Sequence, residues 1–142
     1  QTIPVGDTLN ISDEGSGTNN AYTLTDTTFR KTLVPPPAPA TVWGQISYET
    51  VETLNIETGS GNDAVTVTES LGSIHVTANG GAGNDVLTGD DEDDTFNGDA
   101  DADTITGGDG SNAITGGLGL LALVPVTAAS FYLSYRDIFH GE

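Results

Sequence analysis

The sequence has no cysteine and no methionine, and it has only three lysine or arginine residues against 21 aspartate or glutamate residues. Without cysteine, no disulfide can stabilise the fold, so a metal must do so. The net charge of −18 opposes compaction unless bound cations neutralise it. It also argues against nucleic-acid binding, which depends on basic residues. The absence of methionine even at position 1 predicts a processed chain or an excised fragment.

The sequence also lacks recognisable catalytic motifs. It has no H-E-x-x-H, no G-x-S-x-G, no phosphate-binding loop and no cysteine nucleophile. His75 alternates with two apolar neighbours, so we expect its side chain to face solvent, and His140 has no partner motif. We therefore predict that the chain is not an enzyme.

What the sequence does contain is a run of five nine-residue frames in one register. They read GGAGNDVLT (80–88), GDDEDDTFN (89–97), GDADADTIT (98–106), GGDGSNAIT (107–115) and GGLGLLALV (116–124). Glycine opens every frame. The sixth positions are Asp85, Asp94, Asp103, Asn112 and Leu121, and the eighth are Leu87, Phe96, Ile105, Ile114 and Leu123. A glycine-aspartate turn followed by a short strand with one core-facing residue predicts a rung of a solenoid.

These frames resemble G-G-x-G-x-D-x-U-x, the calcium-binding nonapeptide of the RTX (repeats-in-toxin) proteins. The resemblance covers residues 80–124 and implies a β-roll in which two frames make one turn. Equivalent turns then lie 18 residues apart, with calcium between neighbouring turns. This implies that Asp85 and Asp103 stack on one edge and that Asp94 and Asn112 stack on the other.

Calcium suits this composition because it takes roughly 6–8 oxygen ligands from carboxylates and backbone carbonyls. Glycine allows the turn conformations that aim carbonyls inward. Ten of the 21 acids lie between Asp85 and Asp109. With Ca²⁺ as the expected cofactor, the candidate ligands are Asp63, Asp85, Asp90, Asp94, Asp99, Asp101, Asp103, Asp109 and Asn112.

Some frames depart from the family pattern. Asp90 and Asp99 stand at the second position, and Glu92 and Asp101 stand at the fourth, where the family has glycine. These turns should hold more carboxylate and have less backbone freedom. Frame five has no acid, so the calcium sites should stop near Asn112.

Upstream of the frames, apolar and polar residues alternate with the period of half-buried strands. The alternating pairs are Leu9 and Ile11, Tyr22 and Leu24, Leu54 and Ile56, Val65 and Val67, and Ile74 and Val76. Residues 59–67 form a degenerate copy of the nonapeptide, with Asp63 and Val65 at its key positions. The expected fold is all-β, a parallel β-solenoid with an apolar C-terminal segment.

The proline run VPPPAPA (34–40) favours an extended conformation that cannot lie in a central strand. It would be a spacer between two β lobes or a strap across the solenoid. The expected organisation is an N-terminal β segment (1–33), a proline-rich strap or linker (34–44), irregular rungs (45–79), the β-roll (80–124) and an apolar cap or assembly tail (125–142).

The apolar stretch LLALVPVTAASFYLSY (120–135) allows three interpretations. Residues 116–135 are long enough for a membrane span, which needs about 20 apolar residues. They could instead form a last rung followed by a strand that caps the solenoid or seeks a partner. The RTX resemblance also implies a C-terminal secretion signal, and residues 137–139 resemble its ending.

The function expected from these features is structural. We predict a secreted, extracellular or cell-surface calcium-binding protein that stacks end to end with copies of itself in a bacterial surface, matrix or filament. The alternative is the C-terminal calcium-folding and secretion module of a larger RTX toxin, protease or adhesin. A third hypothesis is a surface protein anchored by its apolar tail.

Overall fold

All regular structure in the described residues is β-strand. The computed structural model describes residues 6–34, 42–49, 51–68 and 74–116. Its strands are β1 (Thr8–Ser12), β2 (Asn20–Leu24), β3 (Thr28–Leu33), β4 (Val42–Ser47), β5 (Thr53–Glu57), β6 (Ala64–Val67), β7 (His75–Asn79), β8 (Val86–Thr88), β9 (Thr95–Asn97), β10 (Thr104–Thr106) and β11 (Ala113–Thr115). The all-β expectation is confirmed for these residues.

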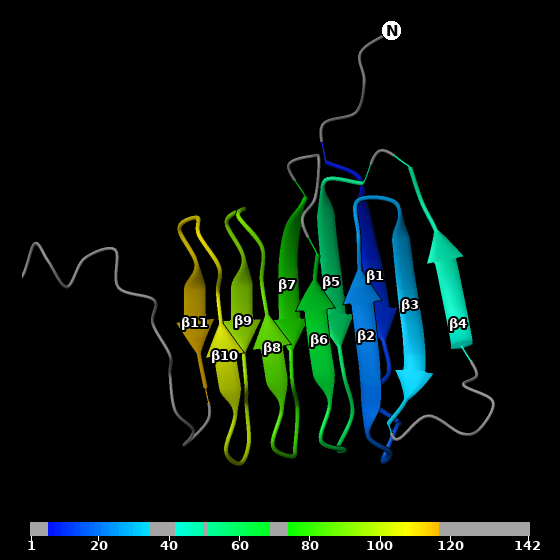
Figure 1. Cartoon of the computed structure of the whole chain (residues 1–142), viewed down its shortest axis with the longest axis vertical. Helices are drawn as coiled ribbons and strands as arrows, with labels where there is room; N and C mark the ends of the chain where they lie inside the picture. Colours follow the sequence, from blue (N-terminus) through cyan, green and yellow to red (C-terminus); the bar gives the residue numbers. More distant parts are fainter. Residues whose placement is uncertain (1–5, 35–41, 50, 69–73, 117–142) are drawn as a thin grey trace, which may run out of the picture.

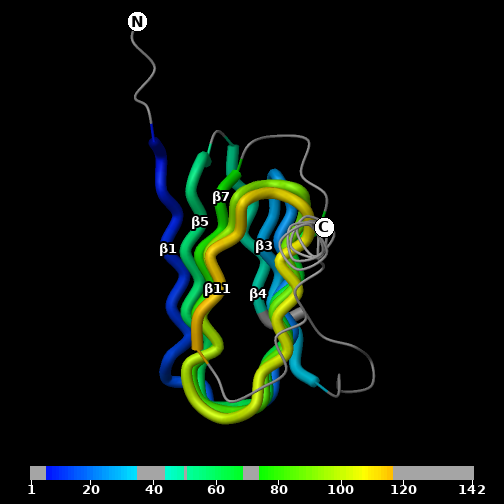
Figure 2. The backbone as a smooth tube through the Cα atoms, turned by 90° about the vertical axis from the view of Figure 1, so that its left-hand side faces the viewer, coloured from blue at the N-terminus to red at the C-terminus, as the bar shows by residue number. Residues whose placement is uncertain are grey.

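The strands form two sheets that face each other (Figures 1 and 2). One sheet has the order β1-β5-β7-β9-β11, and every pairing in it is parallel. The other has the order β10-β8-β6-β2-β3-β4, and its pairings from β10 to β2 are parallel. From β5 to β11 the chain alternates between the sheets, so successive turns lie at opposite edges.

The hairpins β2-β3 and β3-β4 are antiparallel, which makes the second sheet mixed. The expectation of a purely parallel arrangement was wrong here. Only residues 25–27 join β2 to β3, and a short turn permits an antiparallel pair but not a parallel one. The Thr25 hydroxyl closes this turn by accepting the backbone N–H of Thr28 at 2.9 Å.

Within the nonapeptide frames, strands pair at the spacing that the resemblance implied. Val86 of β8 pairs with Thr104 of β10, and Thr95 of β9 pairs with Ala113 of β11. The hydrogen bonds between these turns span 18 residues. Upstream, the number of residues between hydrogen-bonded turns differs from 18. For example, the bond between the turns before β6 and β8 spans 22 residues.

The core lies between the two sheets and contains the residues at the eighth position. Leu87 and Phe96 are fully buried, Ile105 is 3% exposed, and Ile114 packs against them from the end of the stack. The apolar residues of β2, β5, β6 and β7 extend this core, as their alternation predicted. His75 is exposed, also as predicted.

Two predicted features lie largely outside the described residues. They are the proline run, of which only Val34 is described, and the apolar C-terminal segment, including Leu121 and Leu123. Within the described ranges, no helix is long and apolar enough to span a membrane.

Candidate metal centre

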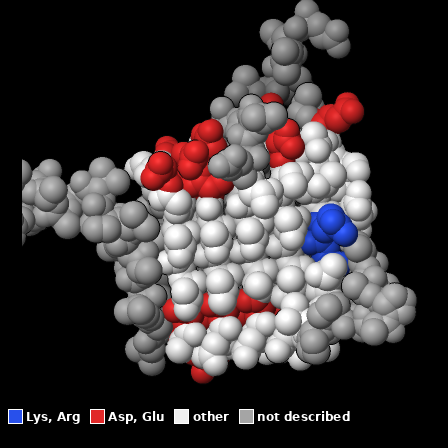
Figure 3. Space-filling view, in the orientation of Figure 1, with Lys and Arg blue, Asp and Glu red and all other residues white. Residues whose placement is uncertain are grey.

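The residues at the sixth position of the frames, together with Asn20 and Asp63 upstream, form two rows, one at each edge of the stack. The lower row in Figure 1 contains Asn20, Asp63, Asp85 and Asp103, at or just before the starts of β2, β6, β8 and β10. The upper row contains Asp94 and Asn112, just before β9 and β11. Figure 3 shows acidic side chains gathered at these two edges, whereas the described basic side chains lie over β3.

Except in Asn20, one side-chain oxygen of each row residue accepts a backbone N–H from the preceding turn of the stack. The backbone N–H of Asn20 donates to Asp63 Oδ1 at 2.8 Å, that of Asp63 to Asp85 Oδ1 at 2.7 Å, and that of Asp85 to Asp103 Oδ1 at 2.9 Å. In the upper row, Val76 donates to Asp94 Oδ1 at 3.0 Å, and Asp94 donates to Asn112 Oδ1 at 2.9 Å. Each side chain therefore ties its own turn to the turn before it.

The second carboxylate oxygen is buried without a hydrogen-bond partner in the frames. This holds for Oδ2 of Asp85, Asp90, Asp94 and Asp103 among the described residues. These side chains belong to residues that are between 1% and 7% exposed. A buried carboxylate with one oxygen left unpartnered is destabilising unless a proton or a cation neutralises it.

The pKa values of two of these carboxyl groups are raised because burial disfavours their charged form. Burial raises the pKa of Asp85 to about 6, against the partial opposition of a backbone hydrogen bond and with the help of the charges of Asp63 and Asp103. Burial likewise raises the pKa of Asp94 to about 6, and the charge of Asp90 adds to the shift. Without a cation, both carboxyl groups take up a proton near pH 6, well above the pH at which an ordinary aspartate does so.

Backbone oxygens approach the same carboxylates where the first glycine of a frame lacks a side chain. A Cβ on Gly80 would lie 2.5 Å from Asp85 Oδ2 and 3.1 Å from the carbonyl oxygen of Gly98. A Cβ on Gly89 would lie 2.5 Å from the Gly107 carbonyl oxygen and 2.6 Å from Asp94 Oδ2. Carboxylate and carbonyl oxygens of neighbouring turns are the ligands that calcium accepts.

Side chains alone do not surround a cation in the described part of the chain. It contains no group of three or more His, Asp or Glu side chains that could hold a metal ion. A calcium site in these turns must therefore take most of its ligands from backbone carbonyls. The partnerless carboxylate oxygens and the adjacent carbonyl oxygens fit such an ion.

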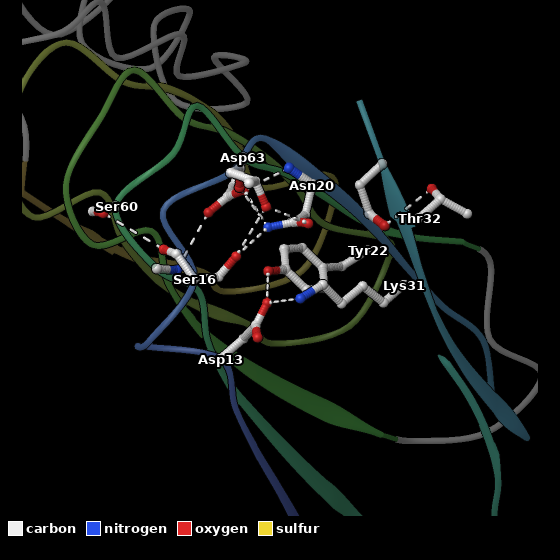
Figure 4. A network of polar contacts seen from close by, with 11 residues as sticks. Asp13, Ser16, Asn20, Tyr22, Lys31, Thr32, Ser60 and Asp63 are labelled. Carbon is white, nitrogen blue, oxygen red and sulfur yellow. Dashed lines mark hydrogen bonds and ion pairs between the residues drawn. The ribbon is translucent and has the colours of Figure 1, made fainter. Parts of the chain in front are cut away.

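The N-terminal end of the lower row is satisfied by protein groups instead (Figure 4). Asp63 Oδ1 also accepts the side-chain amide of Asn20 at 3.3 Å, and its Oδ2 accepts the backbone N–H of Gly59 at 3.3 Å. Nearby, Asp13 accepts the Tyr22 hydroxyl at 2.5 Å and forms an ion pair with Lys31. Asp63 thus differs from the aspartates of the frames because neither of its oxygens lacks a partner.

The other predicted ligands differ in how far they are exposed to solvent. Asp99, Asp101 and Asp109 are exposed, whereas Asp90 is buried. Asp99 and Asp101 have φ values of 63° and 76°, the left-handed conformation of the glycines that they replace. The amide of Asn112 donates to the carbonyl oxygens of Gly107 at 2.9 Å and of Asp109 at 2.5 Å.

A second ladder, at the fifth position, was not predicted from the sequence. Asn62 donates its backbone N–H to Asn19 Oδ1 at 2.9 Å, and Asn84 donates to Asn62 Oδ1 at 3.0 Å. The ladder continues at Ala102, whose backbone N–H donates to Asn84 Oδ1 at 3.0 Å. A repeated sequence pattern could have revealed this ladder and the lower row from β2 onward. It reads Asn19-Asn20-Ala21, Asn62-Asp63-Ala64 and Asn84-Asp85-Val86.

In the calcium-free protein, acidification from pH 8 to pH 5 is expected to raise the melting temperature. The folded pKa values of Asp85 and Asp94, about 6, lie above the ordinary value of 3.8, so the folded state binds protons more tightly than the unfolded state. Stability is therefore gained as the pH falls through 6. Melting in chelator across this range checks the sign, and a melting temperature that falls with acidification would contradict it.

Comparison with known proteins gives one family. The pattern of the RTX calcium-binding nonapeptide repeat, in four copies, matches residues 77–105 and 88–119. The comparisons with curated proteins and with solved structures gave no match. RTX nonapeptide repeats bind Ca²⁺, and the partnerless carboxylates lie within the matched residues. Residues 77–119 of this chain are therefore a segment of RTX calcium-binding nonapeptide repeats.

Proposed function

We propose that this chain is a calcium-stabilised, non-catalytic β-solenoid that acts as a structural subunit outside the cell and stacks end to end with copies of itself. The observation that carries the calcium part is the series of buried, partnerless Oδ2 atoms on Asp85, Asp94 and Asp103 in successive turns. Calcium held between these turns acts as the staple that a chain without cysteine requires. RTX repeat proteins are typically secreted by bacteria, which supports an extracellular location.

The proposal that copies of the chain stack end to end is supported by the unpaired edges of the strands at the two ends of the stack. Among the described residues, β1 and β4 end the sheets on one side, and β10 and β11 end them on the other. A terminal strand offers unpaired backbone groups to another chain. Contact between the two different ends repeats without closing, so it produces a filament.

A module of a larger RTX protein is the second candidate. The family match supports it, because it covers residues 77–119, a part of the chain. In that case the repeats would fold in calcium outside the cell, and the partner would be another domain instead of another copy.

Light scattering in calcium tests the assembly. The wild-type chain is expected to form species heavier than a monomer, and Ile46→Lys should reduce their mass. Ile46 is 42% exposed on the terminal strand β4, where a charge discourages pairing between edges. Val86→Lys is the matched control, because Val86 is 46% exposed but lies on β8, between β6 and β10. A wild-type monomer in calcium would refute self-assembly and leave the module.

A further inference from the structure

Frames two and three both place an aspartate at the second position, and the two side chains lie in different surroundings. Asp99 is exposed, has a φ of 63°, and accepts the side-chain amide of Asn97 at 2.6 Å. Asp90 is only 7% exposed. Its Oδ1 accepts the backbone N–H of Glu92 at 3.1 Å, and its Oδ2 has no partner among the described residues.

Asp90 lies in the same turn as Asp94, the first aspartate of the upper row. Asp94 is 1% exposed and also has an unpartnered Oδ2. In each carboxylate, one oxygen thus accepts a backbone N–H, and the other is buried without a hydrogen-bond partner among the described residues. Their charges act on each other. Two buried like charges in one turn are unfavourable unless a cation neutralises them.

Few positive groups are available at this turn. The sequence contains no lysine or arginine between Lys31 and Arg136. Among the described residues, Lys31 pairs with Asp13 in the network beside β2 and β3. His75 has a favourable charge interaction with Asp94, but its Nδ1 is exposed and lies 3.0 Å from the carbonyl oxygen of Asp93. A full neutralising charge must therefore come from solution.

The neighbouring turns differ in charge and in backbone. Those that end at Asp85 and Asp103 each have a single partnerless row carboxylate. Their second positions, Gly81 and Asp99, have positive φ, whereas Asp90 does not. Frame two therefore departs from the left-handed conformation at this position, and its second-position side chain is buried.

We propose that the turn 89–94 is a two-carboxylate cation site, in which Asp90 and Asp94 together bind one divalent ion of the calcium class. This inference rests on the proposed calcium-stabilised fold and deepens it by ranking its sites. The turn has one more buried carboxylate with a partnerless oxygen than the turns of Asp85 and Asp103. Because the number of charged ligands tunes calcium affinity, this site fills at the lowest calcium concentration and empties last on chelation.

The test uses the full chain, first freed of metal and then titrated with CaCl₂ while amide resonances of each turn are followed by NMR. In the wild type, amides of residues 89–94 are expected to respond before those of residues 80–85 and 98–103. Asp90→Asn should weaken calcium binding at this turn by at least about tenfold. Asp99→Asn is the matched control: it removes the same charge at the same repeat position and should change that affinity by less than about twofold, because exposed charges are screened.

The outcomes separate this inference from the proposed function. If residues 89–94 respond last in the wild type, or if the two variants weaken the turn equally, calcium binding stands and the two-carboxylate site is refuted. If the wild type binds no calcium at any turn, the calcium-stabilised fold is refuted as well. The filling order in the wild type decides the matter even if Asp90→Asn does not fold.

Discussion

Removal of calcium is expected to unfold the frames between residues 80 and 116 and to abolish much of the β signal in circular dichroism. An ion that binds only the folded state contributes about 2.7 kcal/mol per site at a hundredfold excess over its Kd. Sites at Asp85, Asp94 and Asp103 would together contribute about 8 kcal/mol, which is comparable with the whole stability of a typical domain. Chelation also leaves the buried carboxylate oxygens without a counter-charge.

Melting followed by circular dichroism in calcium and in chelator measures this loss. Added calcium should restore the signal, whereas magnesium at the same concentration should not, because it requires near-ideal octahedral geometry and gives up its waters reluctantly. The magnesium arm also controls for screening of the net charge by salt. An unchanged melting temperature after thorough chelation would show that calcium does not hold the fold.

Phe96→Ala is expected to lower the free energy of unfolding by roughly 3–5 kcal/mol in saturating calcium. Phe96 is fully buried and pairs with Ala78 of β7 on one side and Ile114 of β11 on the other. Its ring also lies against Gly89, where a Cβ would be 2.8 Å from Phe96 Cε2. Truncation therefore leaves a cavity between the sheets at the centre of the frames.

Val86→Ala is the control for this substitution, because Val86 lies on the neighbouring frame but is 46% exposed. A change within about 0.5 kcal/mol is expected there. Denaturation in urea measures both variants. A loss below about 1 kcal/mol for Phe96→Ala would mean that the eighth position does not face the core.

The frames could be predicted because a fixed period reveals both the strand and its buried face. Leu87, Phe96 and Ile105 recur every nine residues, so their burial follows from the pattern alone. The β3 and β4 strands could not be predicted in this way. In β3, Lys31 interrupts the buried alternation because it pairs with Asp13, and in β4 the apolar Ile46 faces solvent.

For the candidate site, the repeat identifies the aspartates at the sixth position. It does not show which carboxylates are buried or which of their oxygens lack a hydrogen-bond partner. Asp90 and Asp99 occupy the same position in their frames, yet one is buried and the other is exposed. Local turn conformation decides this, and the nonapeptide pattern does not encode it. Likewise, only the structure separates Asp63, whose oxygens are satisfied by Asn20 and Gly59, from the partnerless Asp85.

Hydrogen exchange, resolved by residue, tests most directly whether calcium holds these rows together. The amides of Asp85 and Asp94 donate to the next residue of their rows, Asp103 and Asn112, so their protection reports the stacking of turns. We expect strong protection of these two amides in calcium and its loss in chelator, while the amides of the β2-β3 hairpin stay protected. Equal protection of Asp85 and Asp94 with and without calcium would contradict it.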